Sequence, residues 1–363
     1  MKKIIFIVII SIFILGFFIF VKSSSADDVT LFVDDDYNET TQGWNVDHFS
    51  KIQDAINATK AGNTVFVYNG TYYEHIVLDK SIVFRGEDRN YTIIDGTRSG
   101  DVIVISANNV SIYNFTVKNS NDGGVGINIY SDFSFIYGNI IVNNGWSGIK
   151  TGNACKDCSI IKNNIVNNGY GLFFNEMTIN NNFSGNIIDN NRWDGIYLDH
   201  SNDGVVADNT VTNNGDDGVS LIFCNNVTIY RNIIGINIDN GVYLYSSTTI
   251  INENTVANNV VSGIFLRNSN DSCICWNAVS YSENGIELTY FSSDNNIHNN
   301  SLTENSIGIH VSSDAEGNYL SDNVFLGNNE NIHQETSLTP GFEIILAIFT
   351  IMLVLLWKNH KKG

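Results

Sequence analysis

The sequence contains a single proline, Pro340, and no amphipathic helical stripe recurs along it. Asn and Gly stand instead between short runs of Ile and Val, which is typical of many short strands joined by tight turns. Basic residues are also scarce, because 19 Lys and Arg face 38 Asp and Glu and leave a formal net charge of −19. A polyanionic partner needs a basic surface, so this charge excludes nucleic acid as a partner.

A repeat of about 23 residues occupies most of the sequence. Two patterns recur in step, a Gly followed by apolar residues at the first and third positions after it, and an Asn followed by one or two apolar residues. The glycines are Gly126, Gly148, Gly171, Gly195, Gly218, Gly241, Gly263, Gly285 and Gly308. The asparagines are Asn139, Asn164, Asn186, Asn209, Asn232, Asn254, Asn277, Asn300 and Asn323.

The content of each repeat predicts the fold. No unit contains the helix or leucine scaffold that helical and leucine-rich solenoids need, and strands of three to five residues are all that fit. Apolar residues after each glycine, such as Ile196 and Leu198, would face inward and their neighbours outward. We therefore predict an all-β, right-handed parallel β-helix (solenoid) of about a dozen coils, with asparagines that hydrogen-bond between coils and tolerate left-handed backbone angles.

The ends of the chain indicate export and anchoring. Residues 1–26 combine a basic start, an apolar run and small residues, as in a signal peptide or an N-terminal anchor. The β-helix domain is predicted over residues 27–330, with an amphipathic capping helix near 50–58 for which Ser50 is a candidate N-cap. A polar stalk, 331–339, would lead to an apolar segment over 344–357 and a basic tail.

Two stretches resemble known sequences. The stretch from residue 31 to 96 resembles the opening of NosD-like β-helix proteins in Phe32–Asp36, Ile52–Ile56, Ala61–Val65, Asn69–Glu74, Asp79–Ile82, Arg85–Glu87 and Ile93–Gly96. That family includes periplasmic factors for maturing a copper site and archaeal surface proteins, and the wider fold includes pectate lyases, polygalacturonases and uronate epimerases. Residues 340–363, beginning with Pro340, Gly341 and Phe342, resemble the archaeal PGF-type sorting signal. This resemblance implies a sorting transpeptidase as partner and a membrane-anchored, outward-facing domain.

Ten Asn-x-Ser/Thr sequons agree with a location outside the cell. These glycosylation candidates are Asn38, Asn57, Asn69, Asn90, Asn109, Asn114, Asn182, Asn226, Asn270 and Asn299.

Aromatic residues at outward positions of the glycine pattern form a candidate carbohydrate-binding patch: Phe173, Tyr197, Tyr243, Tyr245 and Phe265. The alternative is that these rings only pack on one another. Asp194 and Asp217 would lie about 5 Å apart on adjacent coils, where they either form a catalytic pair or Ca²⁺ site or remain solvated turn acids. Solvated acids are the interpretation we favour from sequence.

Asp199 and His200 are further catalytic candidates, in a segment that faintly resembles the Tyr and His of uronate epimerases but lacks the proline of that pattern. The Gly-His-Gly and Arg-x-Lys segments of polygalacturonases are absent from the sequence. The sequence thus favours a non-enzymatic surface protein that binds glycans or envelope proteins. A polysaccharide-active enzyme and a copper-delivery protein remain as alternatives.

The five cysteines suggest two separate roles. Cys155 and Cys158 are a candidate disulfide in an oxidising exterior. Cys273, Cys275 and His298 would share one outward face, where soft ligands suit Cu(I) or Zn²⁺. With 3 Met and 7 scattered His, the composition does not support a copper-handling role, so no cofactor is assigned and Ca or Cu stays open.

Overall fold

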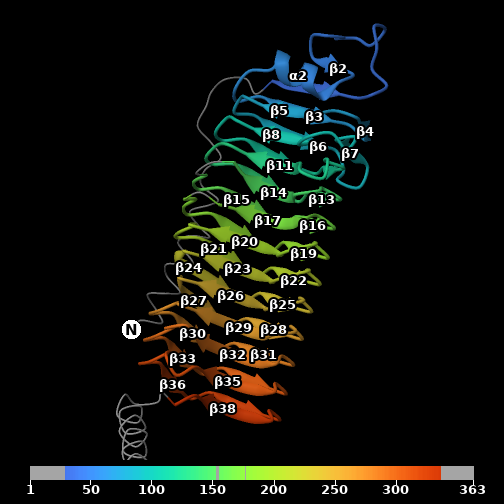
Figure 1. The fold of residues 1–363 in the computed structure, drawn as a ribbon. Coiled ribbons are helices and arrows are strands. Elements are labelled where there is room, and N and C mark those ends of the chain that lie inside the picture. Colours follow the sequence, from blue (N-terminus) through green and yellow to red (C-terminus); the bar gives the residue numbers. More distant parts are fainter. Residues whose placement is uncertain (1–28, 153–154, 176, 337–363) are drawn as a thin grey trace, which may run out of the picture.

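Three strands in each repeat build a parallel β-helix, in which successive coils add strands to three sheets that run the length of the molecule (Figure 1). The computed structural model describes residues 29–152, 155–175 and 177–336. We call the sheets A, B and C. The prediction of an all-β parallel solenoid of about a dozen coils is confirmed.

Sheet A has 14 strands. They are β1 (Thr30–Val33), β2 (His48–Phe49), β3 (Thr64–Val67), β6 (Val83–Gly86), β9 (Ser111–Tyr113), β12 (Phe135–Tyr137), β15 (Ser159–Ile161), β18 (Asn182–Ser184), β21 (Val205–Ala207), β24 (Asn225–Tyr230), β27 (Thr248–Asn252), β30 (Cys273–Cys275), β33 (Asn296–His298) and β36 (Tyr319–Ser321).

Sheet B has 12 strands. They are β4 (Gly70–Tyr72), β7 (Thr92–Asp95), β10 (Thr116–Lys118), β13 (Ile140–Val142), β16 (Asn164–Val166), β19 (Ile187–Asp189), β22 (Thr210–Thr212), β25 (Ile233–Gly235), β28 (Thr255–Ala257), β31 (Ala278–Ser280), β34 (Ser301–Thr303) and β37 (Val324–Leu326).

Sheet C also has 12 strands and contains the glycine pattern. They are β5 (Ile76–Leu78), β8 (Ile103–Ile105), β11 (Val125–Ile129), β14 (Ser147–Thr151), β17 (Tyr170–Phe174), β20 (Ile196–Asp199), β23 (Val219–Ile222), β26 (Val242–Tyr245), β29 (Ser262–Arg267), β32 (Asn284–Thr289), β35 (Ile307–Val311) and β38 (Glu330–Gln334).

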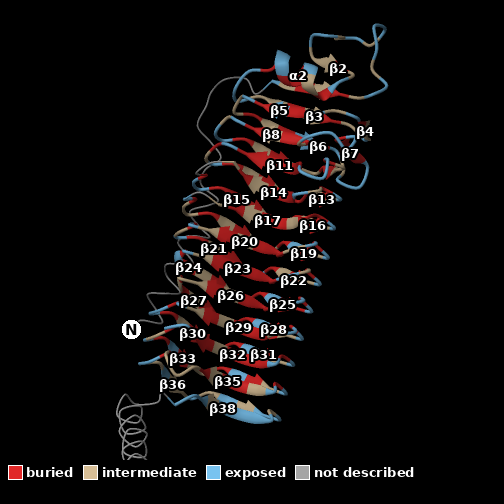
Figure 2. Ribbon diagram, viewed as in Figure 1, coloured by how far each residue is buried: buried red, intermediate tan, exposed pale blue. Residues whose placement is uncertain are grey.

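The core is the continuous, filled apolar interior that the three sheets enclose, which we call the bore (Figure 2). In sheet C, Ile196, Val219, Val242 and Ile264 stack in register and are fully buried, as the alternation after glycine predicted. The glycine itself is required by close packing: a Cβ on Gly195 would lie 2.5 Å from Cγ1 of Val211 and 2.7 Å from the carbonyl oxygen of Gly218.

Asparagines bridge the coils at the corner between sheets A and B. Asn209 illustrates the pattern: its backbone N–H and its Nδ2 donate to Oδ1 of Asn232 at 2.9 and 3.0 Å, and Nδ2 also donates to the carbonyl oxygen of Phe183. These buried amides satisfy turn backbone that water cannot reach.

One detail of the asparagine prediction is wrong. The member of this row between Asn139 and Asn186 is Asn163, not Asn164, which begins β16. In this row the left-handed backbone falls on the residue before each bridging asparagine, as at Asp208 (φ 55°) and Arg231 (φ 54°), whereas other turn asparagines, such as Asn143 (φ 58°) and Asn213 (φ 55°), adopt it as predicted. The asparagine side chain instead bonds to the neighbouring coils and, as at Asn232, to the carbonyl oxygen two residues earlier in its own coil.

The sequence analysis missed two further polar rows. Asparagines form one at the corner between sheets B and C: Asn144, Asn168, Asn191, Asn214, Asn237 and Asn259. Ser201, Cys224, Ser247, Ser269 and Ser292 form the other, after the sheet C strands. Cys224 is thus a buried structural residue, and burial raises the pKa of its thiol to about 12.

The short helix α2 (Ile52–Ala58) covers the first coils, with Ile52, Ala55 and Ile56 buried against the bore. The expected N-cap, Ser50, is wrong, because the helix is preceded by Lys51, whose side chain makes no capping bond. The cap comes from another coil: the two carboxylate oxygens of Glu74 accept the N–H groups of Ile52 and Gln53 at 2.8 and 3.0 Å.

Glu74→Ala is expected to destabilise α2 by about 1–2 kcal/mol, because two N–H groups lose a charged acceptor at the helix N-terminus. Amide hydrogen exchange of Ile52 and Gln53 should accelerate accordingly, whereas Glu39→Ala, in an exposed turn, should leave it unchanged. Unaltered exchange in Glu74→Ala would show that the helix is held by its apolar face alone.

The C-terminal end of the solenoid differs from the prediction, which placed a polar stalk directly after residue 330. Residues 330–334 form strand β38, which pairs in parallel with β35, so the solenoid extends into the predicted 331–339 segment. Figure 2 shows this strand as largely exposed. Residues 1–26, Pro340–Phe342 and the apolar segment 344–357 lie outside the described residues, so those predictions remain predictions.

Candidate functional site

The outer face of sheet C carries the predicted aromatic patch. Phe173, Tyr197, Ser220, Tyr243 and Phe265 occupy equivalent positions on consecutive strands. The rings of Phe173 and Tyr197 stack with centroids 4.9 Å apart and planes 5° apart, and those of Tyr243 and Phe265 lie 5.4 Å apart. Ser220 separates the two pairs. Tyr245 lies apart from them, beside Phe223 and Arg267.

Three aromatic residues that the sequence analysis missed enlarge the first pair. Trp146 and Trp193 lie just before strands of sheet C and Tyr170 is the first residue of β17; their rings contact one another at 4.9–5.9 Å between centroids. Tyr170 also contacts Phe173 (4.8 Å) and Tyr197 (5.6 Å). We call these five residues the aromatic cluster. Each of the three precedes a repeat glycine by one or two residues, which is a signal that a search of turn positions would have found.

Asp194 follows Trp193 and lies beside this cluster, and Asp217 lies next to Asp194 on the following coil; both are buried. Oδ1 of Asp194 accepts the N–H of Asp217 at 2.9 Å, and Oδ1 of Asp217 accepts both the N–H and Nδ2 of Asn240 at 3.0 and 2.9 Å. Oδ1 of Asn240 in turn accepts the N–H of Ser262. The side chains of Asp194 and Asp217 are 5 % and 6 % exposed, so the interpretation as solvated turn acids is wrong.

Burial and proximity change the acidity of these groups. Burial, followed by the neighbouring Asp217, raises the pKa of Asp194 well above its ordinary value. Burial raises the pKa of Asp217 to about 7, although two hydrogen bonds from Asn240 oppose the change. Asp216 brings a third carboxylate, with oxygen atoms of all three residues within 4.8 Å of one another. The predicted close approach of Asp194 and Asp217 is therefore correct.

Asn240 shows that an uncharged amide can occupy the same structural position as these two acids. The bonds between coils at this position need only an acceptor for the next N–H, which Asn240 supplies as well as Asp217 does. The two carboxyl groups therefore add acidity that the fold does not require, and buried acidity of this kind concentrates at functional sites.

Asp199 and His200 do not join this group. They lie at the opposite end of β20 and pair with each other, with Nδ1 of His200 2.6 Å from Oδ1 of Asp199. The His200 ring contacts Phe223. A hollow of about 580 Å³ lies elsewhere, lined by residues that include Glu87, Lys162 and Tyr137, and contains none of these candidates.

The outer face of sheet A holds the three predicted metal ligands together. Cys275 and His298 are partners in register, as expected, and Cys273 lies two residues before Cys275 on the same face. The sulfur atoms are 3.4 Å apart, and Nε2 of His298 lies 3.7 Å from Sγ of Cys273. The hydrogen bond from Cys275, with His298 adding to it, lowers the pKa of Cys273 to about 6.

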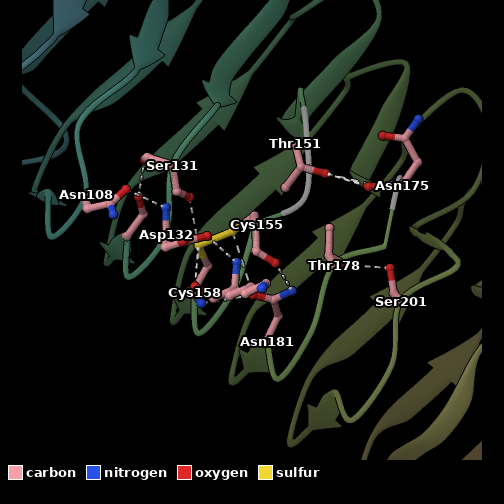
Figure 3. The surroundings of a disulfide bond; sticks show 12 residues. Asn108, Ser131, Asp132, Thr151, Cys155, Cys158, Asn175, Thr178, Asn181 and Ser201 are labelled. Atoms are coloured by element: carbon pink, nitrogen blue, oxygen red, sulfur yellow. Dashed lines mark hydrogen bonds between the residues drawn. A yellow bond between two sulfur atoms is a disulfide. The ribbon is translucent and has the colours of Figure 1, made fainter.

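Cys155 and Cys158 form a disulfide at a buried corner (Figure 3). Asn181, from the following coil, accepts the N–H of Cys158 at 2.9 Å. The glycosylation candidates are compatible with modification: seven are exposed, and Asn114, Asn182 and Asn299 are partly exposed.

Two family models match the chain. The right-handed β-helix region matches residues 54–222, and the periplasmic copper-binding protein NosD matches residues 190–340. No curated protein matches significantly. None of the helices in the described ranges is both long and apolar enough to span a bilayer.

Several solved structures share the fold. The Dettilon tailspike protein superposes with a TM-score of 0.65 at 15% identity over 76% of this chain, which spans only 63% of the tailspike. The A-module of a mannuronan C-5 epimerase from Azotobacter vinelandii gives 0.57 at 15% identity over 79% of this chain and 93% of the module. DFA-IIIase from Arthrobacter chlorophenolicus gives 0.56 at 12% identity over 80% and 84%. At such identities the similarity concerns the fold alone.

Proposed function

Because the chain is a NosD-like parallel β-helix protein, we propose that it binds an extended neutral polysaccharide along the outer face of sheet C. The observation that carries this proposal is the adjacency of the aromatic cluster to the buried Asp194–Asp217 pair. Ring faces stack on the apolar faces of sugars, and carboxyl oxygens accept hydrogen bonds from sugar hydroxyls. The straight stack of coils offers equivalent positions at the spacing between strands, which suits a repeating ligand.

The acids of this face outnumber its cations, Lys150, Arg192 and Arg267, which lie over aromatic rings, and so select against acidic glycans. Asp194, Asp216, Asp217 and Asp239 lie near one another, since each of the other three raises the pKa of Asp194. The net charge of −19 adds to the repulsion of a polyanion. We therefore expect neutral oligosaccharides, such as cello-, xylo- or manno-oligosaccharides, to bind more tightly than oligogalacturonate or alginate fragments.

The double variant Tyr197→Ala/Tyr243→Ala is expected to weaken glycan binding about 5- to 100-fold, because each stacked ring contributes roughly 0.5–1.5 kcal/mol. Isothermal titration with the tightest oligosaccharide of the panel measures the change. The matched control is Tyr281→Ala/Tyr319→Ala, which removes two exposed tyrosines from other faces. Equal binding by all three proteins, with stability retained, would contradict the proposal. A large drop in melting temperature of the first variant alone would show that the rings serve packing.

Glycoside cleavage is a second candidate, favoured by the elevated pKa of Asp217 beside another carboxyl group. A carboxyl protonated near neutral pH can donate a proton to a leaving group. Release of reducing ends from a bound oligosaccharide tests this candidate. Release that disappears in Asp217→Asn while binding persists would support it, and no release from any bound glycan would leave binding as the function.

We also propose that the protein acts outside the cytoplasm, attached to the membrane through its C-terminal segment. The disulfide, the accessible sequons and the periplasmic family model support export. Surface proteolysis of intact cells, with mass spectrometry of the mature termini, tests both export and removal of the segment after Pro340. Recovery of the unprocessed chain inside the cell would contradict it.

A further inference from the structure

Cys273, Cys275 and His298 form a compact set of donors on sheet A, on a different sheet from the proposed glycan face. Two residues apart on β30, the cysteines point to the same side, and parallel pairing places His298 of β33 beside Cys275. One donor atom from each residue lies within 4.8 Å of the other two. β30 pairs with β27 on one side and β33 on the other, so the donors are held by ordered backbone.

One matching family model describes a copper-binding protein, so we ask whether these three residues suit copper. Their chemistry does. Thiolate sulfur is a soft ligand that selects Cu(I), and imidazole also binds copper. The described residues bring three donors together here and no fourth. A structural Zn²⁺ site almost always has four ligands, so Zn²⁺ would have to take water as the fourth.

We propose that Cys273, Cys275 and His298 form a three-coordinate binding site for Cu(I). This proposal is independent of glycan binding. The ion reaches the site from the solvent side, because Cys273 and His298 are partly exposed while Cys275, at 8 % exposure, forms the inner wall. Two thiolates and one Cu(I) leave a single negative charge, which needs less compensation than two separate thiolates.

The residues around the donors support a ligand role. Asn299 Nδ2 lies 2.7 Å from Nδ1 of His298, which fixes the ring with Nε2 directed at the sulfur of Cys273. A histidine that binds a metal through Nε2 carries its proton on Nδ1 and donates it to an acceptor, so in the loaded site the Asn299 amide turns to present Oδ1 to Nδ1. On the other side, Asn252 is the neighbour of Cys275 in register, and its buried Oδ1 has no hydrogen-bond partner among the described residues. This acceptor is available to a Cys275 thiol or to a water at the site.

The strand keeps the two sulfur atoms available. Residues two apart on an extended strand have Cα atoms separated by about 6.6 Å, at the long end of the range for disulfides. Joining Cys273 to Cys275 would have to bring the sulfur atoms from 3.4 Å to bonding distance on a strand whose neighbours on both sides hold it in register. The pair stays as two thiols at a distance that a single ion can bridge.

Anaerobic titration of the reduced full chain with Cu(I), in competition with bicinchoninate, tests the proposal. We expect one Cu(I) per chain, with affinity reduced at least about 100-fold in Cys273→Ser and in Cys275→Ser, and about 10- to 100-fold in His298→Ala. Cys224→Ser is the matched control, because serine already occupies the equivalent position in neighbouring coils, and it should bind as the native chain does.

X-ray absorption of the copper-loaded chain provides a second readout, with two sulfur ligands and one nitrogen ligand expected. Native affinity in Cys273→Ser would overturn the proposal, as would a Cys273–Cys275 disulfide in the protein isolated without reductant. Zn²⁺ that competes successfully against excess Cu(I) would overturn the assignment of the metal. Circular dichroism of each variant confirms that a lost site is not a lost fold.

Discussion

Ile264→Asp is expected to unfold the middle of the solenoid, at a cost of more than about 4 kcal/mol. Ile264 is fully buried in the bore between Val242 and Ile286 of the adjacent coils. An aspartate there is an unpaired charge in an apolar environment, and the apolar contacts of the isoleucine are lost as well. Because each coil is stabilised by its neighbours, the damage should spread to both.

Thermal and urea unfolding, followed by far-UV circular dichroism, measure this loss. The matched control is Phe265→Asp, one residue further along the same strand and directed outward, which should cost less than about 1 kcal/mol. Equal losses in the two variants would contradict the inward and outward assignment on which both the bore and the proposed binding face depend.

Asp217→Asn is expected to stabilise the protein, and increasingly so as the pH rises. A carboxyl whose pKa is raised from 3.8 to about 7 by folding binds its proton more tightly in the folded state. Stability is therefore highest below about pH 4 for this group and falls as the pH rises to about 7, by on the order of 4 kcal/mol for a single independent group. An asparagine does not ionise, so this loss disappears.

The structure indicates how the asparagine would fit. Asn240 donates from Nδ2 to Oδ1 of Asp217, and an asparagine at 217 can donate in the same way to Oδ1 of Asp194. Unfolding measured at about pH 5 and about pH 8 should give a larger gain at the higher pH. Asp203→Asn, at an exposed turn, should change little at either pH. A gain that is the same at both pH values would show that Asp217 does not titrate in this range in the folded protein.

Residues whose positions are fixed by the repeat were predictable from sequence. The glycine pattern alone indicated that Ile196, Leu198 and Ile264 face the bore, because side chains alternate along a strand and the coils stack in register. The same counting placed Cys275 beside His298 and Asp194 near Asp217. Because the repeat length is nearly constant, residues one repeat apart in the sequence are neighbours in space.

Predictions that depended on turns were less accurate. The sequence analysis assigned one bridging position to Asn164, whereas the structure has Asn163 there. The repeat length varies by a residue between coils, so a count along the sequence cannot separate two adjacent asparagines. Trp146, Tyr170 and Trp193 were missed because they precede the repeat glycines, and the alternation was counted only from the glycine onward. The helix cap was assigned to Ser50, whereas the acceptor is Glu74, 22 residues from Ile52.

The sequence by itself determined the architecture, because a period of about 23 residues with alternating apolar positions has one way to bury its side chains: by stacking coils. It also determined which residues share a face. Tertiary structure alone decided the chemistry of those faces. Burial depends on what the neighbouring coils place over a side chain, so Asp194 and Asp217 read as solvated acids in sequence and became buried groups of raised pKa only once the coils were stacked.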